Sequence, residues 1–257
     1  MNAQIHAIGN IARIIKYGLC VLAKQHKPNW FLSTNIIDLV EDLRISPKQF
    51  VDVGAHNSEI ALWMVEKWPW IEVISFEPNR VRCPIGKWIQ KGLSDERGIR
   101  YFTKDPSEQF ISEEINGYPF EIVRFDSLEE VIRQPAILKI DAEHYSARAM
   151  RGFGERLKEF QVVVIEMANH FPKWHKDYPG EPVIPNQQVE ILQCALAAGL
   201  DSARVVAAEF TPNGVPFYDI AFYRCSDDPS LFKDEAEIST TQQFTNAKAY
   251  ENSIYCH

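Results

Sequence analysis

The sequence predicts an α/β domain, a mostly parallel and doubly wound sheet that ends in an antiparallel hairpin. Three observations predict it. Short apolar strands alternate with amphipathic helices over residues 49–198. Continuous apolar runs such as 162–165 suit strands that are buried on both faces, as in a parallel sheet. Two later strands flank Pro212-Asn-Gly214, a sequence that favours a tight turn between antiparallel strands.

The expected elements follow from apolar periodicity and from the residues that stop it. Pro69 ends one helix, and Gly199 lies just past the end of another. Ser127 and Glu130 have the spacing of a capping box, which predicts a short helix there. The predicted helices are 35–44, 59–68, 127–133, 145–151 and 187–198, and the predicted strands are 49–53, 71–76, 88–93, 99–103, 136–140, 161–166, 205–209 and 218–223. We expect residues 104–119 to be irregular.

The 257 residues suggest one α/β domain with additions. We divide the chain into an N-terminal helical extension (1–46), the α/β domain (47–225) and a polar C-terminal tail (226–257). A net charge of −8 without a basic run argues against binding to nucleic acid. Five cysteines without a CxxC pair argue against a disulfide framework and a metal site, so we expect a cytoplasmic protein with reduced thiols.

Residues 5–22 are apolar at intervals of three and four positions, which predicts a helix with one apolar face. Arg13 and Lys16 interrupt the run, and it is too short and too charged for a membrane span. We interpret it as a helix that caps the domain or forms a homodimer contact. Peripheral contact with a membrane is the alternative.

Four predicted strands end on acids, at Asp52, Glu77, Asp141 and Glu166. Ligands bind at the carboxyl ends of the strands in such sheets, and a carboxylate there can accept hydrogen bonds from ribose hydroxyls. Gly54, without a Cβ, allows close approach of a ligand to the backbone.

A dinucleotide fingerprint would need further glycines, at the positions that His56 and Glu59 occupy. Glu59 would also repel a pyrophosphate at the start of its helix. A phosphate-free ligand with an adenosine and an amino-acid part fits better, and S-adenosylmethionine is such a ligand. We expect Asp52 and the turn amides to hold its amino-acid end and Glu77 its ribose.

Five segments, in this order, resemble the FkbM-type S-adenosylmethionine-dependent methyltransferases over about residues 50–223: Val51-Asp-Val-Gly-Ala-His56, Ser75-Phe-Glu-Pro-Asn79, Leu93-Ser-Asp95, Leu138-Lys-Ile-Asp-Ala-Glu143 and Val164-Ile-Glu166. The resemblance implies a Rossmann-like methyltransferase fold and methyl transfer to a hydroxyl of a sugar, a glycan or a small metabolite. The cofactor-binding residues that we expect are Asp52, Gly54, Ala55, His56, Asn57, Glu77, Pro78, Asn79, Leu93 and Ser94.

A methyltransferase acting on oxygen needs a base for the hydroxyl proton. We expect His144 or Asp141 to be that base, with Glu143 orienting one of them. A purely structural role for His144, as the cap of the following helix, is the alternative.

The chain departs from the family pattern in three places: Ser58 and His144 replace glycines, and the segment 80–91 is short. A serine at position 58 is tolerable if its φ is negative. Two rival functions stay open, a non-catalytic binding module with this fold and a nicotinamide-dependent oxidoreductase.

Overall fold

The computed structural model describes residues 32–33, 36–79, 85–102, 111–112, 118–142, 145–168, 187–210 and 216–224. Several predictions concern residues outside these ranges: the N-terminal helix over 5–22, the C-terminal tail, Glu143 and His144. Within the described ranges, no helix combines the length and the apolar character that crossing a membrane requires.

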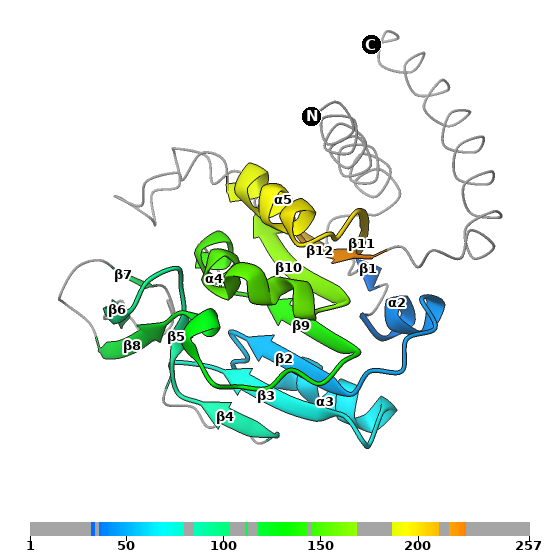
Figure 1. Ribbon diagram of the computed structural model, residues 1–257, viewed down its shortest axis with the longest axis horizontal. Helices are drawn as coiled ribbons and strands as arrows, with labels where there is room; N and C mark the ends of the chain where they lie inside the picture. The colour runs from blue at the N-terminus through cyan, green and yellow to red at the C-terminus, as the bar shows by residue number, and fades with distance from the viewer. Residues whose placement is uncertain are drawn as a thin grey trace, which may run out of the picture. The chain divides into compact units, whose positions relative to one another are not determined.

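In the described part of the chain, eight strands form the main sheet, in the order β1-β11-β12-β10-β9-β2-β3-β4 (Figure 1). Strands β4, β3, β2, β9 and β10 are parallel, whereas β12 runs antiparallel to both β10 and β11. This is the predicted Rossmann-like α/β sheet, with a reversed last strand. The strands are β1 (Leu32–Ser33), β2 (Gln49–Val53), β3 (Glu72–Phe76), β4 (Lys87–Ile89), β9 (Ala136–Ile140), β10 (Val162–Ala168), β11 (Ser202–Phe210) and β12 (Pro216–Tyr223).

The strand order reverses between β2 and β9. From β2 the chain builds outward through β3 to β4, and it then returns to the other side of β2 to form β9 and β10. The connections that follow β2 and β9 lead away from these two adjacent strands in opposite directions. Open α/β sheets bind ligands in the crevice that such connections leave at the carboxyl ends of the strands. Asp52 of β2, Gly54 after β2 and Asp141 after β9 lie at this point.

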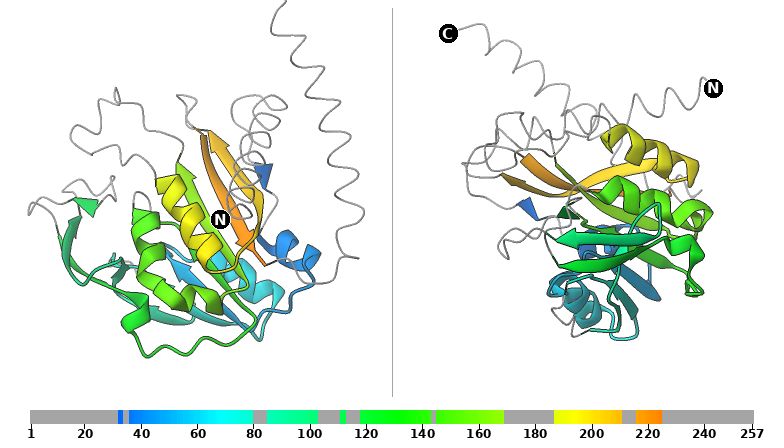
Figure 2. Two further views of the ribbon diagram at one scale, coloured as in Figure 1. Left: turned by 45° about the horizontal axis from the view of Figure 1, so that its top comes forward. Right: turned by 90° about the vertical axis from the view of Figure 1, so that its left-hand side faces the viewer.

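Helices cover both faces of the sheet. On one face, α2 (Ile36–Asp42) and α3 (Glu59–Lys67) pack in a cluster with Phe50 and Ile137. On the other face, α4 (Ser146–Phe153) and α5 (Gln187–Ala197) pack with Val51 and Leu138. Figures 1 and 2 show these two helices over β9 and β10. Successive residues of a strand point to opposite faces, so β2 and β9 are buried on both.

A second sheet, in the order β5-β8-β6-β7, was not predicted as such. Its strands are β5 (Gly92–Leu93), β6 (Gly98–Phe102), β7 (Ile111–Ser112) and β8 (Pro119–Val123), and Figure 2 shows it beside the main sheet. The predicted strand 88–93 is in fact two strands, β4 and β5, in different sheets. The predicted strand 99–103 corresponds to β6, and it pairs with β8 and β7 rather than with the preceding strand.

The helix predicted over 127–133 is wrong. A 3₁₀ helix, η1, covers Phe125–Ser127, and the Ser127 hydroxyl donates to the Arg124 carbonyl instead of capping a following turn. The buried Gln49 side chain holds the next residues extended, because it donates to the Val131 carbonyl and accepts from the Arg133 N–H. A second 3₁₀ helix, η3 (Gly154–Glu159), follows α4.

Candidate functional site

Polar side chains form a row across the α3 face of the sheet. Asp52 is paired in register with Ser75 on β3 and with Lys139 on β9. All three are buried. Phe50 packs on the α3 side of the sheet. Asp52 is two residues further along β2, so its side chain points to the same side. The row therefore lies near the carboxyl ends of β2 and of its two neighbours, β3 and β9.

Gly54 ends β2 with φ +73°, a conformation that glycine adopts without strain. A Cβ at this position would lie 1.8 Å from the backbone oxygen of Asp141. The close approach that the glycine permits is therefore to the chain's own backbone, at the junction of β2 and β9. Contact of Gly54 with a cofactor stays a prediction.

Glu77 follows β3 and fixes the turn that follows β2. Its Oε2 accepts a hydrogen bond from the His56 N–H at 2.9 Å, and its Oε1 accepts one from the Asn79 N–H at 2.7 Å. The residue is only 7% exposed. A carboxylate oxygen has two lone pairs, so each of these oxygens keeps capacity for one more hydrogen bond.

Lys139 lies among carboxylates. Its Nζ is 2.8 Å from Asp141 Oδ2, and the residue is 6% exposed. Burial alone would lower the pKa of this ammonium, but the charges of Asp141, Asp52 and Asp219 outweigh burial and raise it. Lys139 is therefore a permanent positive charge within the site.

The two aspartates beside Lys139 respond in opposite directions. Burial raises the pKa of Asp52 to about 6, although Lys139 opposes the rise. Burial acts in the same sense on Asp141, but there the charge of Lys139, the hydrogen bond that Lys139 donates and a hydrogen bond shared with Glu166 outweigh it and lower the pKa. Asp141 is thus ionised at neutral pH, whereas Asp52 gains and loses a proton closer to neutrality.

The remaining predicted site residues fall into two groups. Ala55 and His56 lie in the turn after β2, Asn57 donates from its side chain to Glu59 Oε1, and Pro78 and Asn79 follow Glu77. These residues lie around the ends of β2 and β3, and their contact with a cofactor stays a prediction.

Leu93 and Ser94 lie instead at the second sheet and against α4. Leu93 joins the α4 side of the core, and the Ser94 N–H donates to the Val123 carbonyl. A Cβ on Gly152 of α4 would lie 2.1 Å from the Ser94 carbonyl oxygen. The contacts found for Ser94 therefore join it to α4 and β8, and its role beside adenine stays a prediction.

Ser58 has φ +60°, so the negative φ on which its tolerance depended is not found. His56, in the same turn, also has a positive φ, of 43°. Ser58 precedes the first residue of α3, and its side chain makes no capping hydrogen bond there. His56 and Ser58 thus have the left-handed conformation that glycine adopts most readily, as Gly54 does in the same turn.

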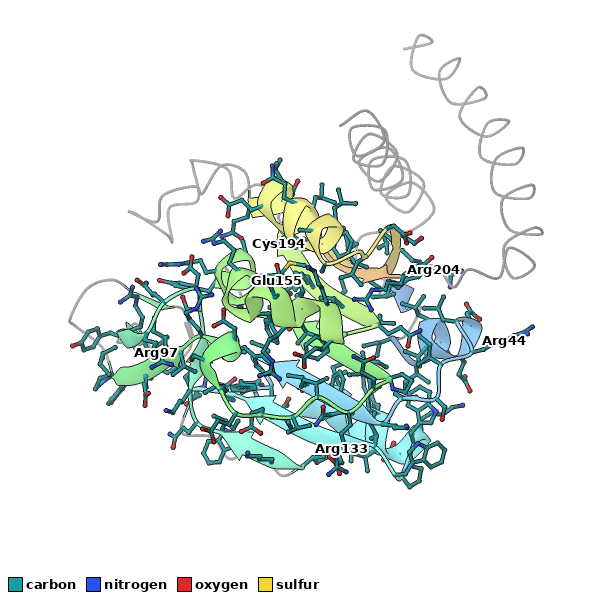
Figure 3. The ribbon with its side chains drawn as sticks, in the orientation of Figure 1. Arg44, Arg97, Arg133, Glu155, Cys194 and Arg204 are labelled. Carbon is teal, nitrogen blue, oxygen red and sulfur yellow. The ribbon has the colours of Figure 1, made fainter. Side chains whose placement is uncertain are left out.

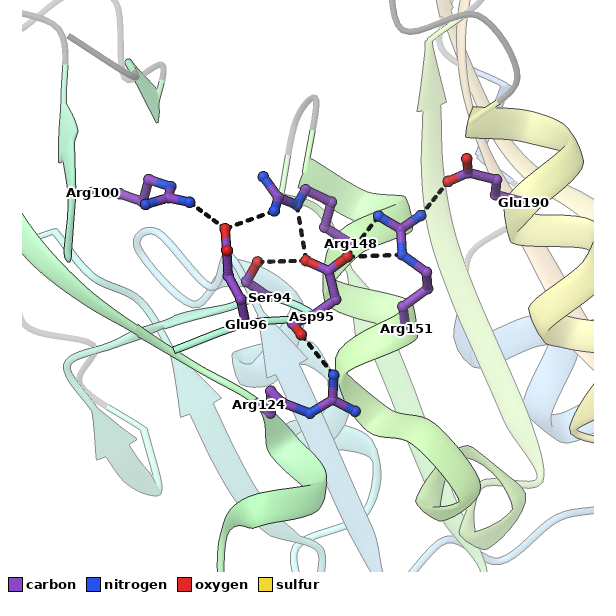
Figure 4. A network of polar contacts seen from close by, with 8 residues as sticks. All are labelled: Ser94, Asp95, Glu96, Arg100, Arg124, Arg148, Arg151 and Glu190. Carbon is purple, nitrogen blue, oxygen red and sulfur yellow. Dashed lines mark hydrogen bonds and ion pairs between the residues drawn. The ribbon is translucent and has the colours of Figure 1, made fainter. Parts of the chain in front are cut away.

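Sequence reasoning missed a network of arginines and acids around Asp95 (Figure 4). The Asp95 carboxylate accepts from Arg148 Nε and Arg151 Nε, each at 2.9 Å, and Arg151 also pairs with Glu190 on α5. Burial alone would raise the pKa of Asp95, but the two arginines lower it. Arg148 and Arg151 are three residues apart on one helix face, which was the available signal. The network ties the end of β5 to α4 and α5.

Cys194 is the one cysteine in the described residues, and Figure 3 shows it on α5 beside α4. Burial raises the pKa of its thiol, which disfavours the reactive thiolate. Among the same described residues, no group of three or more His, Cys, Asp or Glu side chains is arranged to hold a metal ion.

No protein-family model matches the sequence. No curated protein matches it either. Solved structures with a similar fold include a methyltransferase FkbM from Methylobacillus flagellatus KT, at 12% identity and a TM-score of 0.42, which covers 69% of this chain and 44% of that one.

Two further solved structures are similar in fold. The N-terminal domain of EvdMO1, solved in the presence of SAH and D-fucose, has 10% identity and a TM-score of 0.42, covering 74% of this chain and 81% of that one. Human N-acetylserotonin methyltransferase, solved with SAM, has 8% identity and a TM-score of 0.33, covering 72% and 49%. This chain spans only 44% of the length of the methyltransferase FkbM structure. At these sequence identities and TM-scores, structural similarity assigns neither an activity nor a ligand to this chain.

Proposed function

We propose that this chain is an S-adenosylmethionine-dependent methyltransferase of the FkbM type, which transfers a methyl group to a hydroxyl of a sugar, a glycan or a small metabolite. The observation that carries the proposal is the position of Glu77. Its carboxylate lies at the end of β3, next to the reversal of strand order, and is held by the backbone of the turn after β2. A fixed acceptor at that point suits the hydroxyls of a ribose.

The charges around the site support a cationic ligand. Asp52, Asp141 and Asp219 all act on Lys139, so carboxylates outnumber the ammonium in this part of the molecule. S-adenosylmethionine has an ammonium and a sulfonium, which this excess of negative charge attracts. Glu59, exposed in the first turn of α3, disfavours the pyrophosphate of a nicotinamide dinucleotide. The rival oxidoreductase is therefore the weaker interpretation.

S-adenosylmethionine supplies an electrophilic methyl group, so the reaction breaks its carbon–sulfur bond and forms a carbon–oxygen bond to the acceptor. The residues of this chain have to align the acceptor oxygen with that methyl group, which in favourable cases lowers the barrier by about 7–11 kcal/mol. They also have to remove the hydroxyl proton.

His144 is a better candidate for the base than Asp141. Lys139 lowers the pKa of the Asp141 carboxyl, and a carboxylate that is already strongly stabilised accepts a proton poorly. An ordinary imidazole has a pKa near neutrality. Glu143 would then orient the imidazole. Both Glu143 and His144 are outside the described residues, so these roles follow from the sequence alone.

Calorimetry with S-adenosylhomocysteine, S-adenosylmethionine and NAD tests the proposal on the wild type and on two variants. Glu77→Gln removes the charge but keeps one acceptor for the turn, and Glu72→Gln changes an exposed acid at the other end of the same strand. We expect Glu77→Gln to weaken binding of the two adenosyl ligands by about 10- to 150-fold, or about 1.5–3 kcal/mol. Glu72→Gln should leave it unchanged.

Binding of NAD without either adenosyl ligand would refute the proposal. Equal affinities of the wild type and Glu77→Gln would remove Glu77 from the site. His144→Ala should retain cofactor binding and lose methyl transfer, and full activity of that variant would refute its role as the base.

The non-catalytic alternative has one structural observation in its favour, the left-handed conformation of Ser58 where the family has glycine. It predicts that S-adenosylhomocysteine binds but that no hydroxyl acceptor is methylated. Screening sugars, glycans and small alcohols for release of S-adenosylhomocysteine distinguishes the two functions.

A further inference from the structure

Among the described residues, four buried side-chain atoms have no hydrogen-bond partner: Asp52 Oδ1, Ser58 Oγ, Ser75 Oγ and Arg100 Nε. Buried polar atoms are nearly always satisfied by protein or by ordered water. Arg100 belongs to the second sheet. The other three belong to β2, β3 and the residue that precedes α3, which are neighbours in the fold.

The fold brings the three residues to the same side of the main sheet. Asp52 and Ser75 are directly paired in register and point to the α3 face. Ser58 is buried and immediately precedes α3, whose Ala61 packs on that face. Since α3 runs back from the carboxyl end of β2, its first turn lies over the end of the strand where Asp52 and Ser75 are found.

Ser58 is a strained residue that makes no use of its hydroxyl within the described chain. Its φ of +60° is readily adopted by glycine, and the side chain is 1% exposed. A glycine would remove both the strain and the unsatisfied hydroxyl. A ligand for the hydroxyl would explain why a serine can occupy the position.

The chemistry of the three atoms selects the ligand. The carboxylate oxygen only accepts a hydrogen bond when ionised, whereas each hydroxyl can donate or accept. The negative charge of Asp52 disfavours an anion, and one carboxylate with two hydroxyls falls short of the oxygen ligands, about six to eight, that a calcium ion takes. A water molecule satisfies three such partners, which is the usual number for an internal water.

We propose that one internal water beneath the first turn of α3 bridges Asp52, Ser58 and Ser75. The two serines are then positioning residues, which orient the Asp52 carboxylate through this water. The role of that carboxylate in holding the cofactor rests on the proposed function, but the water itself does not.

The titration of Asp52 reports on the bridge. The charged groups that act on it are Lys139 and Asp141 from β9 and Glu77 from the end of β3, and burial raises its pKa to about 6. Hydrogen bonds donated to a carboxylate favour its ionised form. Loss of a hydroxyl from the bridge therefore raises the pKa of Asp52 further.

Three variants separate the hydroxyls from the strain. Ser58→Ala keeps the left-handed residue and removes the hydroxyl, Ser58→Gly removes both, and Ser75→Ala removes the partner on β3. Ser127→Ala is the control, because the Ser127 hydroxyl donates to a carbonyl away from this row. Carbon-13 NMR follows the Asp52 carboxyl through a pH titration of the free protein, and Asp52→Asn assigns its signal.

We expect the three variants to raise the pKa of Asp52 by about half a unit or more, and Ser127→Ala to leave it unchanged. Ser58→Ala and Ser58→Gly should give the same shift, although Ser58→Gly is the more stable protein. A crystal structure of the wild type should contain the water. An unchanged Asp52 titration in Ser58→Ala and Ser75→Ala overturns the proposal, as does an empty space beneath α3.

Cofactor affinity separates this proposal from the proposed function. S-adenosylhomocysteine should bind Ser58→Ala at least about 2-fold more weakly than the wild type near pH 6, as a pKa shift of half a unit requires, and the difference should vanish about two units higher, where Asp52 is ionised in both proteins. A loss that does not depend on pH contradicts the positioning role. No binding to the wild type refutes the proposed function and leaves the Asp52 titration to decide on the water.

Discussion

The replacement Gly54→Ala tests how tightly β2 and β9 meet beneath the site. The added Cβ would lie 1.8 Å from the Asp141 backbone oxygen and 2.8 Å from its carbonyl carbon. Neither backbone can withdraw easily, because the Gly54 N–H donates to the Phe76 carbonyl and the Asp141 N–H donates to the Val53 carbonyl. The left-handed residue costs about 1–2 kcal/mol, and forced backbone movement in a packed region costs about 1–3 kcal/mol. We therefore expect a loss of about 2–5 kcal/mol in the free energy of unfolding.

Urea denaturation measures this loss, with Gly199→Ala as the control. Gly199 has φ +78°, close to that of Gly54, but a Cβ there would meet only Arg224 Nε, at 3.8 Å. Gly199→Ala therefore reports the cost of the backbone conformation alone, about 1–2 kcal/mol. If Gly54→Ala destabilises the protein no more than Gly199→Ala does, the close packing of β2 against the Asp141 backbone is refuted.

Three further changes test the buried polar groups. Lys139→Met leaves buried carboxylates without a compensating charge, so at neutral pH it should lower the free energy of unfolding, measured by urea denaturation, by about 3–5 kcal/mol. Lys87→Met, at an exposed ion pair, should lower it by at most about 1 kcal/mol. Equal losses in the two variants would contradict this. Asp52→Asn should gain stability relative to the wild type as pH rises from about 4 to about 6, because a carboxyl whose pKa is raised from 3.8 opposes folding once it ionises. The gain should reach about 3 kcal/mol above that window, and thermal melts that differ by a constant amount at every pH would refute it. Gln49→Leu should cost about 1–3 kcal/mol in urea denaturation, because two backbone groups lose their partner, and a neutral result would contradict that role.

The main sheet could be predicted because its central strands are apolar runs between clear stops. Residues 136–140 and 162–165 are short, almost continuously apolar runs, which favour buried strands. The structure places them in β9 and β10. The second sheet could not be predicted in the same way. Its strands are short and partly exposed, and β5 pairs with β8 about thirty residues later, so their stability comes from pairing rather than from local pattern.

The candidate site likewise contains residues that local sequence pattern predicts and one that it does not. Asp52, Glu77 and Asp141 could be predicted because each follows an apolar run, and parallel strands bring their carboxyl ends together. Lys139 belongs to the segment Leu138-Lys-Ile-Asp-Ala-Glu143, but that motif predicts no role for it. In the sequence it is one polar residue within a buried strand, and only the register with Asp52 shows that it opposes the charge of that residue.

The conformation of Ser58 shows what a pattern of residue types leaves out. Two hydrogen bonds fix its backbone, since its N–H donates to the Ala55 carbonyl and its carbonyl accepts from the Leu62 N–H. The first closes the turn after β2 and the second begins the ladder of α3, so the geometry of the turn and the helix sets φ whichever residue is present. A left-handed residue is therefore a property of this βα connection, and the chain tolerates serine there at the cost of strain. This departure from glycine adds a buried hydroxyl at the start of α3, the helix that covers the face of the sheet where Asp52, with its raised pKa, lies.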